Sequence, residues 1–299
     1  MHVAVYATLL IDAVLVLAAL AATAHLHPRW ATSLLTATTV VVAASWAAAL
    51  TVLAAGSFGG LVVAIDVKRR PTSLALPTPV PAGVEFVALG ALVIAAVGVV
   101  TTGRRMAMAA RERSQLRRVA GDAELAVVDL PAPVAVALPG RPGRIVVSQS
   151  MLRALDARER RALLAHERAH LRLRHNLYMA VADIGAAVNP MLIPVRTRTR
   201  YFMERWADEE AARDLGERRT VACALARAAL AVAGQSPPAP AFATTGVPAR
   251  VEALLQAAPV NGQWRLLWPA ALGCTAILLA AEATHDLERI FELAVRLTH

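Results

Sequence analysis

Lysine, cysteine and aromatic residues are scarce in this chain, and their scarcity excludes several classes of protein. The two cysteines, Cys223 and Cys274, are too few for a disulfide-stabilised secreted domain and fit a reducing compartment. Aromatic residues make up only 4% of the 299 residues. The net charge is +9, but much of the arginine excess follows an apolar run, where it would meet anionic lipid headgroups. We therefore expect no direct binding of nucleic acid.

Long apolar runs dominate the N-terminal third. Hydrophobic residues make up 57% of the chain, which is high for a soluble domain. Residues 3–24, 31–56 and 83–102 each approach the roughly 20 residues that cross a bilayer, and residues 266–284 form a shorter fourth candidate. The second run continues to about residue 65, and Gly56, Gly59 and Gly60 predict where its helix ends or bends. The first run contains Asp12 and lacks a basic start, so it does not resemble a signal peptide. Asp12 is expected to face other helices.

Arginine placement predicts the orientation of these spans. Six arginines follow the third run, which favours a cytoplasmic location for that end: Arg104, Arg105, Arg111, Arg113, Arg117 and Arg118. Lys68, Arg69 and Arg70 oppose this orientation, because they would lie on the other side of the membrane. They precede the proline-rich loop 71–81, which joins the second and third spans.

Residues 166–170 form an H-E-x-x-H pentad within a predicted helix. Asp156 and Glu159 have capping-box spacing, and residues 157–175 contain no glycine or proline. Histidines four apart on a helix project from one face about 6 Å apart, so His166 and His170 could share a zinc ion. Glu167 could then act as a base on water. A pentad can also arise by coincidence, so the interpretation needs a third ligand.

Glu204 is the candidate third ligand. It lies in a second run without glycine or proline, residues 196–215, which Gly216 is placed to end. Two histidines, one glutamate and an open fourth position are typical of catalytic zinc. Asp208 shares a helical face with Glu204 and could orient a ligating histidine. The alternative is a solvated acidic face, because two glutamates follow. His175, about 140° around the same helix from His170, is not expected to bind this metal.

The blocks H-E-R-A-H-L-R-L-R-H-N (166–176) and E-R-W-A-D-E-E-A (204–211) resemble those of integral-membrane gluzincin metallopeptidases. Residues 137–140 and 144–148 resemble the short β-hairpin before the zinc helix in that group. The chain is most similar to the BlaR/MecR-type antirepressor peptidases, and next to the HtpX and CAAX-prenyl-protease family. The resemblance implies one Zn²⁺ per chain on His166, His170 and Glu204, with Glu167 as catalytic base. It implies a multi-pass α-helical membrane protein with a mainly α, α+β gluzincin-like domain that carries a short β-hairpin or sheet.

The expected organisation is three transmembrane helices in residues 1–102, a cytoplasmic metallopeptidase domain in 103–265, a fourth span in 266–284 and a short tail in 285–299. We expect a bacterial cell membrane protein without an extracellular penicillin-binding sensor domain. Ile65 stands three residues before the only lysine, which excludes an S-x-x-K motif. The expected function is cleavage of a cytoplasmic protein in regulatory proteolysis, such as inactivation of a winged-helix repressor. The alternatives are HtpX-like quality control of membrane proteins and a non-catalytic transducer with a structural zinc.

Several finer features stay open at this point. The substrate is expected along an exposed strand edge, either at 144–147 or at Val134, Ala135, Val136, Ala137 and Leu138. Tyr201 or an arginine near Glu204 is a candidate for stabilising the oxyanion. Residues 176–195 are either a membrane-dipping hairpin or a buried helix of the peptidase core. Residues 234–250 are expected to form a loop, and the sequence is compatible with a homo-oligomer.

Overall fold

The computed structural model describes residues 2–66, 82–121, 123–234 and 246–259, together with 273–275, 278 and 281. The predicted loop 71–81, most of the loop 234–250, most of the fourth span 266–284 and the tail 285–299 lie outside these residues. The described chain is mostly helical with one small sheet, as expected.

Three long helices follow from the apolar N-terminal runs. They are α1 (His2–Ala22), α2 (Pro28–Asp66) and α3 (Ala82–Val119), with a short 3-10 turn, η1 (Thr23–His25), between the first two. In the described part of the chain, Ala7–His25, Pro28–Ala54 and Gly83–Arg118 are long and apolar enough to cross a membrane. Asp12 is buried between helices, as expected, with the Ser45 hydroxyl 2.7 Å from its carboxylate oxygens.

An end of the second helix at its glycines, one of the two predicted alternatives, was wrong. Helix α2 continues past Gly56, Gly59 and Gly60 to Asp66. Glycine weakens an apolar helix only modestly, because every backbone amide still finds its partner inside the helix. Helix α3 likewise continues beyond the predicted span, so the arginine-rich segment 104–118 belongs to the same helix as the apolar run.

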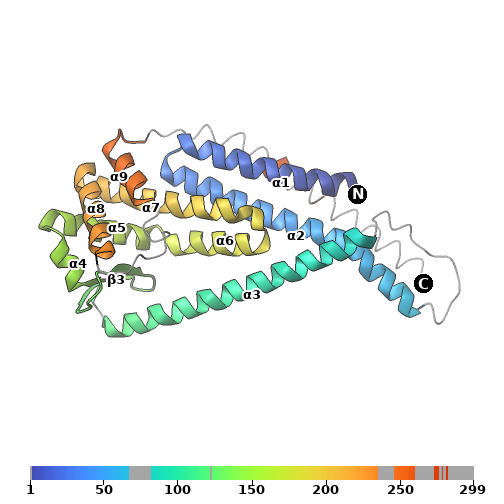
Figure 1. Cartoon of the computed structure of the whole chain (residues 1–299), viewed down its shortest axis with the longest axis horizontal. Helices are drawn as coiled ribbons and strands as arrows, with labels where there is room; N and C mark the ends of the chain where they lie inside the picture. Colours follow the sequence, from blue (N-terminus) through green and yellow to red (C-terminus); the bar gives the residue numbers. More distant parts are fainter. Residues whose placement is uncertain are drawn as a thin grey trace.

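A helical hairpin lies along these long helices. It consists of α6 (His175–Val188), the 3-10 turn η2 (Pro190–Leu192) and the first half of α7 (Ile193–Leu215). Helix α6 packs on both α2 and α3, and α7 packs on α2, so the hairpin lies between the long helices (Figure 1). The packing is tight at Gly185, where an added Cβ would overlap the Thr39 side chain on α2.

The remaining elements gather at one end of the long helices (Figure 1). Strands β1 (Leu125–Val128), β2 (Ala135–Leu138) and β3 (Arg144–Ser148) form a sheet in the order β1-β3-β2. Strand β3 is parallel to β1 and antiparallel to β2, so β2 and β3 make the predicted hairpin. Around the sheet lie α4 (Gln149–Ala154), α5 (Ala157–Arg172), α8 (Arg218–Ala233) and α9 (Val247–Leu255). Buried apolar side chains of β3, of α4 and of Leu155 after it form a core beneath the sheet, and partly buried leucines of α5 pack against it.

Helix α5 begins where the sequence predicts but ends earlier. Asp156 accepts from the first-turn amides and Glu159 accepts from the Asp156 amide, so the capping box is complete. The predicted single helix to residue 175 was wrong, because Arg174 adopts a left-handed backbone and starts a new helix at His175. The other predicted stop was right: Gly216 ends α7 with a φ of 72°, which costs glycine little.

Candidate metal centre

Helix α5 brings the two histidines of the pentad together. The Nε2 atoms of His166 and His170 lie 3.0 Å apart, so both rings point at one place. A helical spacing of four residues places the two side chains on one face of α5.

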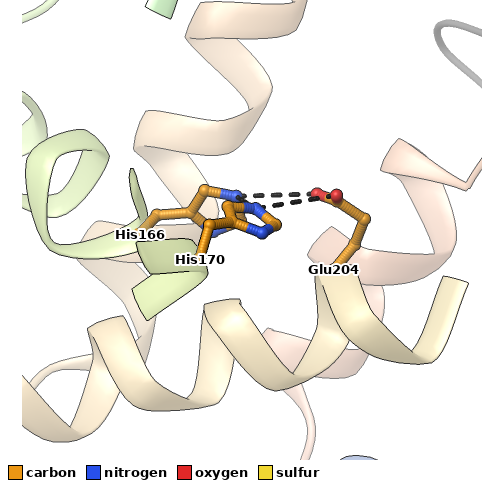
Figure 2. A group of neighbouring side chains, drawn as sticks. All are labelled: His166, His170 and Glu204. Atoms are coloured by element: carbon orange, nitrogen blue, oxygen red, sulfur yellow. Dashed lines mark hydrogen bonds and ion pairs between the residues drawn. The ribbon is translucent and has the colours of Figure 1, made fainter. Parts of the chain in front are cut away.

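Helix α7 adds Glu204 from the opposite side. One carboxylate oxygen lies 3.5 Å from His166 Nε2 and the other 3.6 Å from His170 Nε2. Figure 2 shows the two imidazoles and the carboxylate facing one another across the gap between the helices. One donor atom from each of the three residues lies within 4.8 Å of the others, so the group could hold a metal ion.

A buried ion pair supports His166 from behind. His166 Nδ1 lies 3.1 Å from Asp208, whose side chain is 1% exposed. Arg250 of α9 donates to both oxygens of Asp208 at 2.8 Å and also lies 3.0 Å from Glu204. If Nδ1 of His166 donates to Asp208, its Nε2 carries a lone pair toward the metal position.

His175 supports the second histidine in a similar way. Its Nδ1 lies 2.8 Å from Nδ1 of His170, on the side of that ring away from Glu204. The expected 140° offset assumed one continuous helix, whereas His175 is placed by the break at Arg174. Among the described residues, the group that could hold a metal comprises His166, His170 and Glu204 and does not include His175.

The surrounding charges set the protonation of the three candidate ligands. Burial would lower the pKa of His166, but hydrogen bonds to Asp208 and Glu204 outweigh it and raise the pKa to about 10. Burial and the charge of His166 lower the pKa of His170 to about 3. Burial would raise the pKa of Glu204, but its bond to His166 and the charge of Arg250 hold that pKa well below its ordinary value. The metal-free site therefore combines one charged imidazole, one neutral imidazole and one carboxylate.

Glu167 lies beside this group and is nearly buried, with 9% of its surface exposed. Burial raises the pKa of its carboxyl group. The carboxylate accepts a hydrogen bond from the backbone amide of Ala137 in β2. Strand β2 and Glu167, the candidate catalytic base, are therefore in direct contact.

Two cavities meet at this site, and both include Glu167, Glu204 and Ala135 in their walls. One, of about 350 Å³, lies among α5, α8 and the start of β2; we call it the apolar cavity. The other, of about 820 Å³, lies among α3, α6, α7 and the end of β2; we call it the arginine cavity because four arginines line it. Because the two adjoining cavities share these walls, we refer to them together as the passage.

Strand β2 provides the open edge along this passage. It pairs only with β3 in the described sheet, whereas β3 is paired on both sides. The alternative edge at 144–147 was therefore wrong. The amide of Ser148 donates to the carbonyl of Val134, so in the alternating antiparallel pattern Ala135 and Ala137 turn their backbone groups away from β3.

The acidic residues after Asp208 are not a solvated face. Glu209 and Glu210 are 7% and 8% exposed. Glu209 pairs with Arg205 and Arg218, and Glu210 pairs with Arg172 and Arg213. Tyr201, the candidate oxyanion stabiliser, packs its ring on Phe202 at 5.2 Å and does not line either of the two cavities. Its role stays a prediction.

The comparison with known families covers the part of the site that contains the H-E-x-x-H pentad. Residues 102–194 match the model of peptidase family M48. No curated protein and no solved structure matches the chain. The match includes His166, Glu167 and His170 and ends before Glu204, so this part of the chain is similar to a family of metallopeptidases. It does not distinguish the antirepressor peptidases from the HtpX group.

Two residues of the site escaped the sequence reasoning. Arg250 lies 42 positions after Asp208 and beyond a proline-rich segment, so no local spacing connects them. An arginine near Glu204 was expected, but its position could not be derived. His175 did carry a signal, since it stands five residues after His170, but a helix break was needed to bring the rings together.

Proposed function

We propose that this chain is a zinc-dependent endopeptidase that works at a membrane. The observation that carries the proposal is the meeting of two imidazoles and a carboxylate from two helices, with Glu167 beside them, in a passage bordered by an open strand. The M48 match over residues 102–194 supports the same chemistry.

The donor set fits zinc, and it fits a catalytic rather than a structural site. Catalytic zinc is commonly held by two histidines and one glutamate, whereas structural zinc is enclosed by four protein ligands. Here both cavities reach the ligand group, which leaves room for a substrate. When bound, zinc would lower the pKa of water and polarise the scissile carbonyl.

Glu167 is the proposed general base and acid. The pKa of its carboxyl group is raised toward neutral pH. A group with such a pKa can both take a proton from water and deliver it to the leaving amine. The amide of Ala137 holds the carboxylate in place. Arg250, 3.0 Å from Glu204 and at the wall of the apolar cavity, is a candidate to bind substrate carbonyl oxygens.

The substrate would bind as an added strand on β2. Ala135 directs its amide and carbonyl to the open edge and Ala137 directs its carbonyl there, while the Ala137 amide is taken by Glu167. Backbone hydrogen bonds of this kind bind many sequences, so they provide affinity with little sequence preference.

The membrane setting is supported by the outer surface of α3. Phe86 and Ile94 are 68% and 71% exposed within a helix that is long and apolar enough to span a bilayer. Such surfaces are typical of lipid contact. The hairpin of α6 and α7 lies against the same long helices, which supports its entry into the membrane surface. We retain the cytoplasmic side for the metal centre, from the arginines after residue 103.

The proposal includes regulatory proteolysis of a cytoplasmic protein, such as a winged-helix repressor. HtpX-like quality control is the second candidate within the same chemistry. Full-length Glu167→Gln, which keeps the substrate passage, can be used to trap bound proteins from cells. A repressor among the trapped proteins favours regulation, and a range of damaged membrane proteins favours quality control.

Casein digestion by the purified full-length chain tests the activity itself. We expect zinc-loaded wild type to cleave casein and Glu167→Gln to keep its zinc but lose at least about 100-fold in rate, the scale of a general base. Glu112→Gln, an exposed change on α3, should behave as wild type. Zinc binding without cleavage by wild type would instead favour the non-catalytic transducer.

A further inference from the structure

The arginine cavity carries a charge pattern that the proposed hydrolysis does not need. Apart from the residues of the metal centre, its charged lining consists of four arginines and one aspartate: Arg105 and Arg113 of α3, Arg196 and Arg200 of α7, and Asp183 of α6. Asp183 lies 3.8 Å from Arg196. Outside the metal centre, the lining therefore has three more positive than negative charges, and the carboxyl groups of Glu167 and Glu204 lie at the end of the cavity next to the metal centre.

These arginines are spaced to follow a bound chain. Arg196, Arg200 and Glu204 are four residues apart on α7, so they share one face and rise toward the metal centre in steps of about 6 Å. Arg105 and Arg113 are eight residues apart on α3 and give the opposite wall a similar row. An extended peptide advances about 3.3 Å per residue, so positions two to four residues from the scissile bond would pass Arg200 and Arg196.

The other end of the passage has a different character. Apart from the metal-centre residues and Arg250, every side chain around the apolar cavity is aliphatic, proline or methionine. Val134, just before β2, lines the apolar cavity, and Ala137 within β2 lines the arginine cavity. A chain added to β2 would therefore have one side of its scissile bond among aliphatic groups and the other among arginines.

We propose that the arginine cavity binds acidic side chains of the protein substrate, and that the enzyme prefers bonds with Asp or Glu two to four residues away on one side. This inference rests on the proposed function, because it concerns the same passage. Arginine suits the task, since its planar group can bind a carboxylate through two parallel hydrogen bonds. A peptide is favoured over an anionic lipid because the cavity shares Glu167, His170 and the β2 edge with the metal centre.

Cleavage-site profiling tests this preference. Full-length zinc-loaded enzyme in neutral-lipid nanodiscs digests a complex peptide mixture, and mass spectrometry identifies the cleaved bonds. We expect enrichment of Asp and Glu on one side of the bond in wild type. The double variant Arg113→Gln/Arg200→Gln should cut acidic sites about fivefold less well, the scale of exposed ion pairs, and neutral sites equally well. Arg104→Gln/Arg111→Gln, which removes the same charge outside the cavity, should keep the wild-type profile.

A binding measurement keeps the inference testable even if no cleavage is found. Fluorescence anisotropy compares a labelled Glu-rich peptide with its Gln-matched partner on Glu167→Gln protein. We expect tighter, salt-sensitive binding of the acidic peptide, reduced about fivefold by Arg113→Gln/Arg200→Gln. Absence of cleavage with this preference intact would defeat the proposed function alone. Cleavage or binding that ignores acidic residues would overturn the inference, as would a variant whose only defect is weaker binding to anionic-lipid vesicles.

Discussion

Replacing Asp208 by asparagine should lower both the free energy of unfolding and the affinity for zinc. The contacts of Asp208 determine the size of each effect. Asp208 is 1% exposed and accepts two hydrogen bonds from Arg250 and one from His166. Asparagine can still accept from one partner but removes one of the two carboxylates that face the buried guanidinium, leaving Glu204 at 3.0 Å. Breaking a buried ion pair on one side costs about 3–5 kcal/mol, which is the upper bound for this change because Glu204 remains. Losing the group that orients a ligating histidine typically costs about 10–100-fold in metal affinity.

The assays separate these two effects. Chemical denaturation of the metal-free protein gives the change in unfolding free energy, and zinc titration against a competing chelator gives the affinity of the folded state. Asp214→Asn is the matched control, since Asp214 lies on the same helix, is 40% exposed and faces Arg172 at 3.4 Å. It should cost less than about 1 kcal/mol and leave zinc affinity unchanged. An Asp208→Asn protein with wild-type zinc affinity would refute the claim that Asp208 orients His166.

Four further outcomes are expected. Gly185→Val should destabilise the protein by about 1–3 kcal/mol in thermal unfolding, because its side chain would overlap Thr39, whereas Gly103→Ala has open space and should be neutral or stabilising. The pKa of His166 is raised from 6.5 to about 10, so in metal-free protein its charge contributes stability that is full below pH 6.5 and lost as pH rises through 10. Denaturation at pH 7 and pH 10 should show this loss, and His166→Gln should remove it. Zinc must displace that proton, so its affinity, measured by competition, should rise about tenfold per pH unit between these values. Chelation of zinc should lower the melting temperature, and a melting temperature independent of chelator would mean that no zinc binds the folded state.

The sequence was most informative where a feature depends on neighbours along the chain. The capping box of α5, the shared face of His166 and His170 and the stop at Gly216 all follow from helical geometry and backbone preference. The presence of three long apolar helices could also be predicted, from the apolar runs along the chain. Their ends could not, because α2 passes three glycines that a local rule marks as an end and α3 continues through the arginine-rich segment.

Features that depend on tertiary packing were harder to predict. Arg250 enters the site from α9 because α8 and α9 fold back against α7, and nothing in the local sequence marks it. Glu209 and Glu210 are buried against arginines that come from α5, from α8 and from the next turn of α7 itself. His175 stays outside the candidate ligand group, as expected, but its contact with His170 could not be predicted, because one left-handed residue, Arg174, redirects the chain.

X-ray absorption at the zinc edge tests the central claim most directly, on wild-type and Glu204→Gln protein loaded with one equivalent of zinc. We expect the wild-type spectrum to show two imidazole nitrogens and carboxylate oxygen around the ion. Glu204→Gln should lose the carboxylate contribution and bind zinc more weakly. A spectrum that is unchanged by Glu204→Gln, or that shows sulfur ligands, would contradict a metal centre built from His166, His170 and Glu204.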